Sequence, residues 1–108
     1  MYDFNLLYEF NHPKGTPLNY SKYEEYHFET KNPGQWAFKF PNNYGASVIK
    51  HPGSYGYYED KFELAVLKFE TEEVSEYHLC YDTPITDDVI GYLTEEEVFD
   101  RLEEIKQL

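Results

Sequence analysis

Three side chains near residue 80 have the spacing best suited to chemistry. His78, Cys80 and Asp82 alternate along one segment, so in a strand they would project from the same face. They are at most part of a metal site, because zinc needs three or four ligands and no second ligand pair has the spacing of a known zinc motif. An ordinary strand histidine and a half-buried cysteine explain them more simply. We therefore predict no metal site.

Further acidic residues flank the next turn of the chain. Asp82, Asp87 and Asp88 surround residues 83–86, where a carboxylate pair could act as acid and base or hold a divalent cation. The calcium-loop pattern is missing, and no nucleophile, base and orienting partner can be named together. We predict no enzyme and no cofactor. Catalysis would require a bound metal or a pH-dependent activity that is lost on changing Asp82, Asp87 or His78.

Charge restricts the class of partner. The 108 residues include 21 Asp and Glu against 9 Lys and Arg, a formal net charge of −12, so the chain repels nucleic acid and favours basic proteins. The single cysteine suits a reducing compartment, no apolar run approaches the ~20 residues that span a bilayer, and the N-terminus lacks signal-peptide features. We predict a cytoplasmic protein that binds a protein partner, with no direct nucleic-acid or membrane contact.

The acidic residues concentrate in two stretches, 59–76 and 84–108. They could form a solvated face that only keeps a small domain soluble. Alternatively, their carboxylates could imitate the phosphates of a duplex, which carry about one charge per 1.7 Å of axis, and occupy a basic nucleic-acid channel. The acidic side chains predicted to contact a partner are Glu70, Glu72, Glu73, Asp87, Asp88, Glu96, Asp100 and Glu103.

A second candidate contact region is rich in tyrosine. Aromatic residues make up 19% of the chain, and 12 of them are Tyr. Residues 51–58 combine a proline and two glycines with three tyrosines, which predicts a loop. Binding residues often gather on loops that a rigid scaffold holds. Tyr55, Tyr57 and Tyr58 are therefore predicted to contact a partner.

Alternating apolar residues predict the strands that would position these groups. The period of two is clearest over 2–10, 36–40, 44–50, 62–69 and 77–82. Residues 36–50 and 62–82 are each predicted to form a hairpin, with 62–69 central because both of its faces are largely apolar. Residues 23–29 fit either a strand or a helical turn, and residues 86–91 are predicted to form a short helical turn that Gly91 ends.

The C-terminal helix is the clearest element of the sequence. Thr94 followed by Glu97 predicts a capping box that starts the helix. At 100° per residue Val98, Leu102 and Ile105 form one apolar stripe, so one side of the helix should face a core. We therefore predict an α+β fold, in which a small antiparallel sheet of about five to six strands packs against this amphipathic helix.

Four blocks follow one another along the chain: residues 44–48 (YGASV), 54–56 (SYG), 63–67 (ELAVL) and 81–98 (YDTPITDDVIGYLTEEEV). Together they resemble a group of small uncharacterised bacteriophage proteins over residues 36–108. The resemblance implies a phage setting, hence the cytoplasm of a host cell, and supplies no catalytic residues. It leaves residues 1–35 as an N-terminal strand or accessory arm of a single domain spanning residues 1–108.

Two functions compete in that setting. The first is inhibition of a host nucleic-acid-binding enzyme by an acidic nucleic-acid mimic. The target would be a transcription component or a defence nuclease such as an RNA-guided one, which would make the protein anti-CRISPR-like. This hypothesis rests on the net charge of −12 that a small domain carries. The alternative is a phage accessory or structural module with no inhibitory role, whose tyrosine-rich loop contacts another phage protein.

Overall fold

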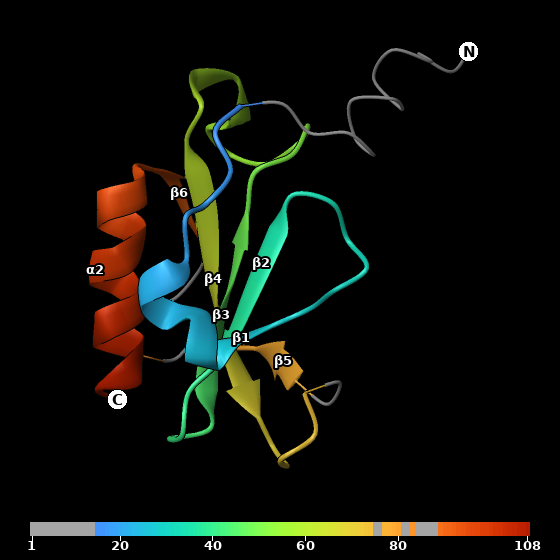
Figure 1. Cartoon of the computed structure of the whole chain (residues 1–108), viewed down its shortest axis with the longest axis vertical. Coiled ribbons are helices and arrows are strands. Elements are labelled where there is room, and N and C mark those ends of the chain that lie inside the picture. The colour runs from blue at the N-terminus through green and yellow to red at the C-terminus, as the bar shows by residue number, and fades with distance from the viewer. Residues whose placement is uncertain (1–14, 75–76, 81–82, 84–88) are drawn as a thin grey trace.

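The computed structural model describes residues 15–74, 77–80, 83 and 89–108. In this part of the chain, six strands form one antiparallel sheet and a C-terminal α-helix packs against it, which confirms the predicted α+β class (Figure 1). The strand predicted over residues 2–10 lies outside the described residues.

Two predicted hairpins form most of the sheet. β2 (Gln35–Lys39) and β3 (Tyr44–Ile49) make the first, and β4 (Phe62–Phe69) with β5 (Tyr77–Leu79) makes the second. β3 also pairs with β4, and the two-residue strand β1 (His27–Phe28) pairs with β2, which gives the order β1-β2-β3-β4-β5. β4 has neighbours on both sides, so its largely apolar sequence reflects a central position, as predicted.

In two segments the structure differs from, or decides between, the elements predicted from the sequence. Residues 23–29 divide between a 3-10 helix η1 (Ser21–Tyr26) and a two-residue strand β1 (His27–Phe28), so each expectation for them holds in part. Ile90–Leu93 forms strand β6, which pairs with the first half of β4. The prediction that Gly91 ends a helical turn is therefore wrong. Backbone groups at the edge of β4 need partners, and β6 supplies them.

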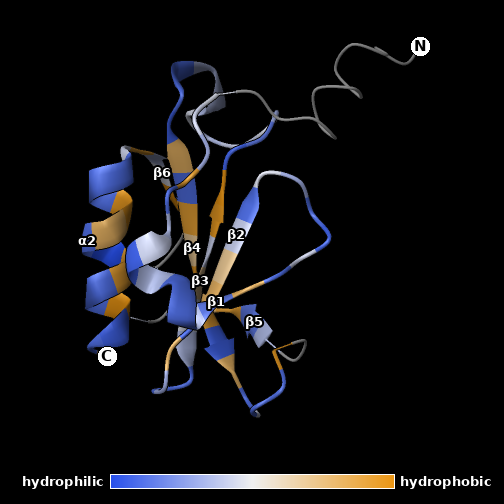
Figure 2. Cartoon of the chain, viewed as in Figure 1, coloured by the Kyte–Doolittle hydropathy of each residue, from blue (hydrophilic) through white to orange (hydrophobic). Residues whose placement is uncertain are grey.

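One face of the sheet forms the main core with helix α2 (Glu95–Lys106). Cross-strand neighbours Phe38, Ala46 and Val66 point to this side, and the predicted helix stripe of Val98, Leu102 and Ile105 is fully buried against them. Figure 2 shows the same division, with hydrophobic positions of α2 turned to the sheet and hydrophilic positions turned outward. Leu18 and Tyr23 also belong to this core, so residues before Trp36 contribute to it.

The other face of the sheet carries a small aromatic group. Phe69 is buried and its ring lies against Phe28 and Tyr77, with centroid distances of 6.0 and 5.5 Å. The ring also covers Gly45, because a Cβ at that glycine would lie 2.8 Å from Phe69 Cε2. The Lys39 ammonium lies 5.6 Å from the centre of the same ring. This face therefore has its own packing, independent of α2.

Candidate protein-binding surface

The first turn of α2 begins as the sequence predicts. The Thr94 hydroxyl accepts the Glu97 N–H at 3.2 Å, and the Glu97 carboxylate accepts the Thr94 N–H at 3.0 Å, which completes the capping box. The bond from the Thr94 backbone lowers the pKa of Glu97 below its usual value. Leu93 and Val98 are both buried beside this cap. The helix therefore starts at a defined place and presents its acidic side chains from a fixed axis.

The last turn of α2 is held by a side chain from the β2–β3 turn. The Asn42 amide donates to the carbonyls of Ile105, Lys106 and Leu108 at 2.9, 3.2 and 3.1 Å. Its own oxygen accepts the Tyr44 N–H at 3.0 Å. The last carbonyls of a helix have no partner within the helix, so this amide satisfies groups that water would otherwise solvate. Both ends of α2 are thus anchored.

Replacing Asn42 tests this second anchor. We expect Asn42→Ala to lower the free energy of unfolding by about 1 kcal/mol, because the last carbonyls lose their donor. Asn42→Asp should cost more, since it places a negative charge beside the negative end of the helix dipole. Urea denaturation followed by the fluorescence of Trp36 measures both. Equal stability of Asn42→Asp and the wild type would contradict the assignment.

The outer side of α2 carries exposed carboxylates, and we call this surface the α2 acidic face. It contains the three helix residues that the sequence predicted as contacts, and all of them are exposed. Two further exposed carboxylates, Glu97 and Glu104, lie beside them, and these two line a shallow hollow along the helix together with Asp100 and Glu103. The members are Glu96, Glu97, Asp100, Glu103 and Glu104. Arg101 lies among them, and its guanidinium donates to both oxygens of Glu104 at 3.1 Å.

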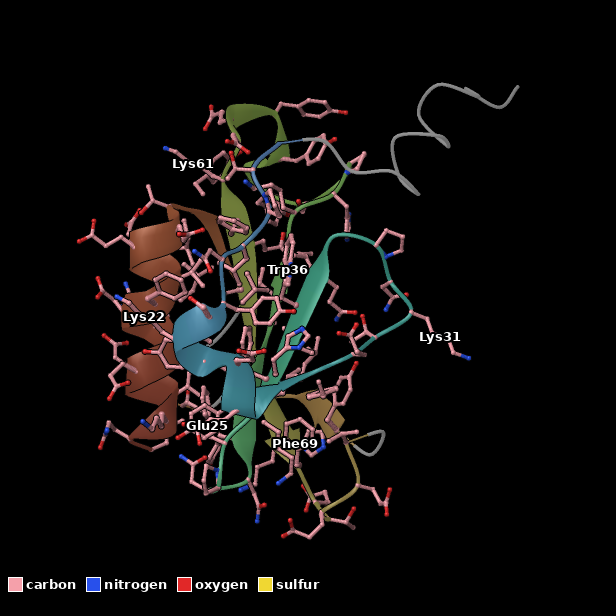
Figure 3. The ribbon with its side chains drawn as sticks, viewed as in Figure 1. Lys22, Glu25, Lys31, Trp36, Lys61 and Phe69 are labelled. Carbon is pink, nitrogen blue, oxygen red and sulfur yellow. The ribbon has the colours of Figure 1, made fainter. Side chains whose placement is uncertain are left out.

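Helix η1 packs against α2 beside the α2 acidic face. The Tyr23 ring stacks on Phe99 with centroids 5.8 Å apart, and its hydroxyl donates to Glu103 at 3.1 Å. Burial, followed by the Glu103 and Asp100 carboxylates, raises the pKa of Tyr23 to about 12. Figure 3 shows Lys22 and Glu25 on η1 beside the helix, and the Lys22 ammonium lies 5.9 Å from the Phe99 ring centre. Tyr23 therefore links η1 directly to the α2 acidic face.

The acidic hairpin between β4 and β5 belongs to a different surface. Glu70, Glu72 and Glu73 are exposed as expected. The Glu72 carboxylate, however, lies 3.7 Å from the Lys39 ammonium, which covers the Phe69 ring on the sheet face away from α2. Glu72 therefore does not extend the α2 acidic face, and a Glu70 oxygen lies near His78 instead. Asp87 and Asp88, also predicted as contacts, lie outside the described residues.

The tyrosine-rich segment forms a loop, as predicted, but its three tyrosines differ in exposure. Tyr55 and Tyr58 are 58% and 77% exposed, whereas Tyr57 is only 8% exposed. Tyr57 starts the short 3-10 helix η2 (Tyr57–Glu59) and anchors it to the protein. Tyr55 and Tyr58 are thus available for contact, while Tyr57 holds the loop in place.

Two of the side chains considered for metal binding, His78 and Cys80, differ in exposure. His78 is exposed, and its Nε2 lies 3.6 Å from a Glu70 oxygen. Cys80 is buried in the core with α2. Within the ranges that the structure describes, no three His, Cys, Asp or Glu side chains gather as metal ligands. Asp82 lies outside those ranges.

Three residues with roles in the structure were not predicted from the sequence. Tyr92 is 53% exposed and adopts a positive φ of 59°, which no local pattern indicates for a tyrosine. Tyr23 and Asn42 act through partners about 80 and 63 residues away along the chain. Asn42 follows a strand and precedes a turn residue, a position typical of a turn and not of a distant helix cap. The roles of these three residues depend on tertiary contacts, which the sequence pattern does not show.

Comparisons with known proteins give no relative for this chain. No family model, no curated protein and no solved structure matches it. Among the described residues, no helix has the length and apolar character required to cross a membrane. The fold and its surfaces define a small α+β domain with an anchored acidic helix on one side and exposed tyrosines on a separate loop.

Proposed function

We propose that this protein is a small acidic binding protein that occupies the basic nucleic-acid channel of an enzyme and thereby inhibits it. The observation that carries the proposal is the α2 acidic face, an exposed row of carboxylates on a helix anchored at both ends. Because the helix itself is already anchored, binding to a basic surface has to order only its exposed side chains. Electrostatic complementarity of this kind favours fast and selective association.

The charge spacing of the α2 acidic face compares with that of a nucleic-acid strand. Glu96 and Glu104 lie eight residues apart, about 12 Å at the rise of an α-helix. The five carboxylates over that length, less the one that Arg101 neutralises, give about one net charge per 3 Å. One DNA strand carries about one charge per 3.4 Å. The face therefore resembles a single strand of phosphates more closely than a whole duplex.

The resemblance to phage proteins provides the setting for this proposal. A phage protein of this kind would act in the host cytoplasm, on a defence nuclease such as an RNA-guided one or on a transcription component. These enzymes share a basic groove that tracks a nucleic-acid backbone. A protein that fills this groove inhibits the enzyme by excluding its nucleic-acid substrate, and it needs no catalytic residues to do so.

A charge-reversal experiment tests the proposal. The triple variant Glu96→Lys/Asp100→Lys/Glu103→Lys should lose capture of a basic nucleic-acid enzyme from host lysate, and added DNA should compete with the wild type. The matched control is Glu70→Lys/Glu72→Lys/Glu73→Lys, with the same charge change on the other surface, which should retain capture. Raising salt from 50 to 200 mM should weaken binding roughly tenfold or more. Binding that ignores both salt and DNA would refute mimicry.

The exposed tyrosines favour a second candidate, a phage accessory or structural module that contacts another phage protein. Tyr55 and Tyr58 expose large rings on a loop that the buried Tyr57 holds. Aromatic side chains of this type dominate the energetics of many interfaces. In this case Tyr55→Ala/Tyr58→Ala should abolish partner capture, whereas the helix triple variant should not.

A further inference from the structure

Three exposed tyrosines from two separate segments surround one hollow at an end of the molecule. Tyr55, Tyr58 and Tyr92 are 58%, 77% and 53% exposed. They line a hollow of about 160 Å³ together with Glu59 and the buried Tyr57. That volume corresponds to about five water molecules, which suits one long side chain. We call this hollow the tyrosine site.

The loop that carries two of these tyrosines is internally bonded. The Gly56 carbonyl accepts the N–H groups of Glu59 and Lys61 at 3.0 and 2.9 Å. The Glu63 carboxylate accepts the Tyr55 N–H at 3.0 Å. Gly56 itself has a φ of 94°, which suits glycine and turns the chain sharply. The tyrosine site is therefore preformed in the protein without a ligand.

The second segment, β6, interlocks with this loop. A Cβ on Gly91 would lie 2.5 Å from Tyr55 Cβ, and a Cβ on Gly56 would lie 3.0 Å from Tyr92 Cα. The Tyr92 N–H donates to the Tyr55 carbonyl at 3.4 Å. Both glycines thus permit the close approach that brings Tyr92 beside the other tyrosines. A side chain at either glycine would push the two segments apart.

Tyr92 occupies a backbone conformation that tyrosine disfavours. Its φ of 59° lies in the left-handed region, where a bulky side chain is an outlier. Its ring is largely exposed, so burial of the ring does not offset this conformation. The register between β4 and β6 shifts between Phe62 and Leu64, so Tyr92 lies in a β-bulge that imposes this conformation. Backbone strain that the surrounding structure maintains is often found at binding sites. This is the second, independent observation that distinguishes the tyrosine site from an ordinary surface loop.

We propose that the tyrosine site binds an arginine side chain presented by a partner protein. The guanidinium would stack on a tyrosine ring while its N–H groups donate to the exposed Glu59 carboxylate. The protein already places cations over rings, with the Lys68 ammonium 4.1 Å from the centre of Tyr44. Arginine suits the site better than lysine, because its planar fork both stacks and pairs with a carboxylate.

Charge disfavours a nucleic-acid strand as the occupant of this aromatic hollow. Exposed tyrosines can also stack nucleobases of a single strand, but such sites combine the rings with a positive groove. Here Glu59 lines the hollow, Glu63 accepts the Tyr55 N–H beside it, and Asp60 pairs with Lys50. Lys61 follows in the same loop, so these five described side chains carry a net charge of about −1 and do not form a positive groove.

The tyrosine site shares no residue with the α2 acidic face, although it adjoins the start of α2, because Glu59 also lines a second hollow with Thr94 and Glu95. Variants can therefore change one surface without changing a residue of the other.

A titration of the whole protein followed by NMR tests the assignment. The probe is the tripeptide acetyl-Gly-Arg-Gly-amide, with the lysine peptide and the neutral, planar citrulline peptide as matched controls. We expect the arginine peptide to shift the NMR signals of Tyr55, Tyr58 and Tyr92. The lysine peptide should bind about threefold more weakly than the arginine peptide. The citrulline peptide should cause no shift. Equal responses to arginine and citrulline, or shifts confined to α2, would overturn the proposal, as would tighter binding of a thymidine oligonucleotide.

Three variants separate recognition from folding. Glu59→Gln should weaken binding of the arginine peptide about threefold. Tyr58→Ala should abolish it, and so should Tyr92→Asn, since asparagine tolerates the left-handed backbone and keeps the loop geometry. Unchanged Trp36 fluorescence shows that each variant is folded. Folded variants that bind the peptide like the wild type would overturn the proposal, whatever the result for the α2 acidic face.

Discussion

Asp60→Asn is expected to lower the free energy of unfolding by about 2 to 3 kcal/mol. The Lys50 side chain is only 2% exposed, and its ammonium lies 2.6 Å from an Asp60 oxygen. The same ammonium donates to the Thr16 carbonyl at 2.7 Å and lies 4.0 Å from the centre of the Phe62 ring. Removing the carboxylate leaves a buried charge without its counter-ion, which costs about 3 to 5 kcal/mol in a fully buried pair. The Asp60 side chain is 51% exposed, so water recovers part of that loss.

A double-mutant cycle isolates this pair. Lys50→Met alone should change stability by no more than about 1 kcal/mol, because a neutral side chain of similar size replaces the buried charge. Asp60→Asn should then cost little in the Lys50→Met background. Asparagine also tolerates the positive φ of 58° at residue 60, so the backbone is not disturbed. An equal cost of Asp60→Asn in both backgrounds would contradict the ion pair.

The pair should also show in the pH dependence of stability. The Lys50 ammonium, followed by the Thr16 N–H, lowers the pKa of Asp60 below its usual value. The folded pKa is thus below the unfolded value of about 3.9, so the contribution is complete above that pH and is lost as the pH falls through the folded pKa. The stability difference between the wild type and Asp60→Asn should therefore shrink below about pH 4. A difference that stays constant from pH 7 to pH 2 would exclude this linkage.

Gly45→Ala is expected to destabilise the protein by about 3 kcal/mol or more. Gly45 lies in β3, and a Cβ there would be 1.9 Å from the Phe38 carbonyl oxygen and 2.8 Å from Phe69 Cε2. Real Cβ atoms do not approach backbone so closely, so β2 would have to move relative to β3. The shift would disturb both the core under α2 and the aromatic group on the other face. Urea denaturation with Trp36 fluorescence measures the loss.

Gly53→Ala provides the matched control for the added methyl group. Gly53 has a φ of 99°, and a Cβ there would meet nothing within 4 Å. The same chemical change then tests backbone strain without a clash, and its expected cost is about 1 to 2 kcal/mol. A smaller loss for Gly45→Ala than for Gly53→Ala would show that β2 and β3 are less closely packed than the structure indicates.

Local signals predicted the parts of the fold that depend on neighbours in sequence. The capping box at Thr94 and the stripe of Val98, Leu102 and Ile105 are contained within one helix, so their spacing alone revealed them. The two hairpins likewise join segments close in the chain. β6 escaped prediction because its four residues include a glycine and gain their strand structure only by pairing with β4, almost 30 residues earlier.

The amino-acid sequence by itself determined the acidity of this protein, its aromatic content, the C-terminal helix and the α+β class. These follow from composition and from periods of two and 3.6 residues, which act over short distances. Only the tertiary structure decided which charges and rings share a surface. It placed Glu72 of the acidic hairpin on the sheet face away from α2, joined Tyr23 to Glu103, and brought Tyr92 beside Tyr55. Contacts between residues distant in sequence depend on how whole elements pack, and no local pattern records that packing.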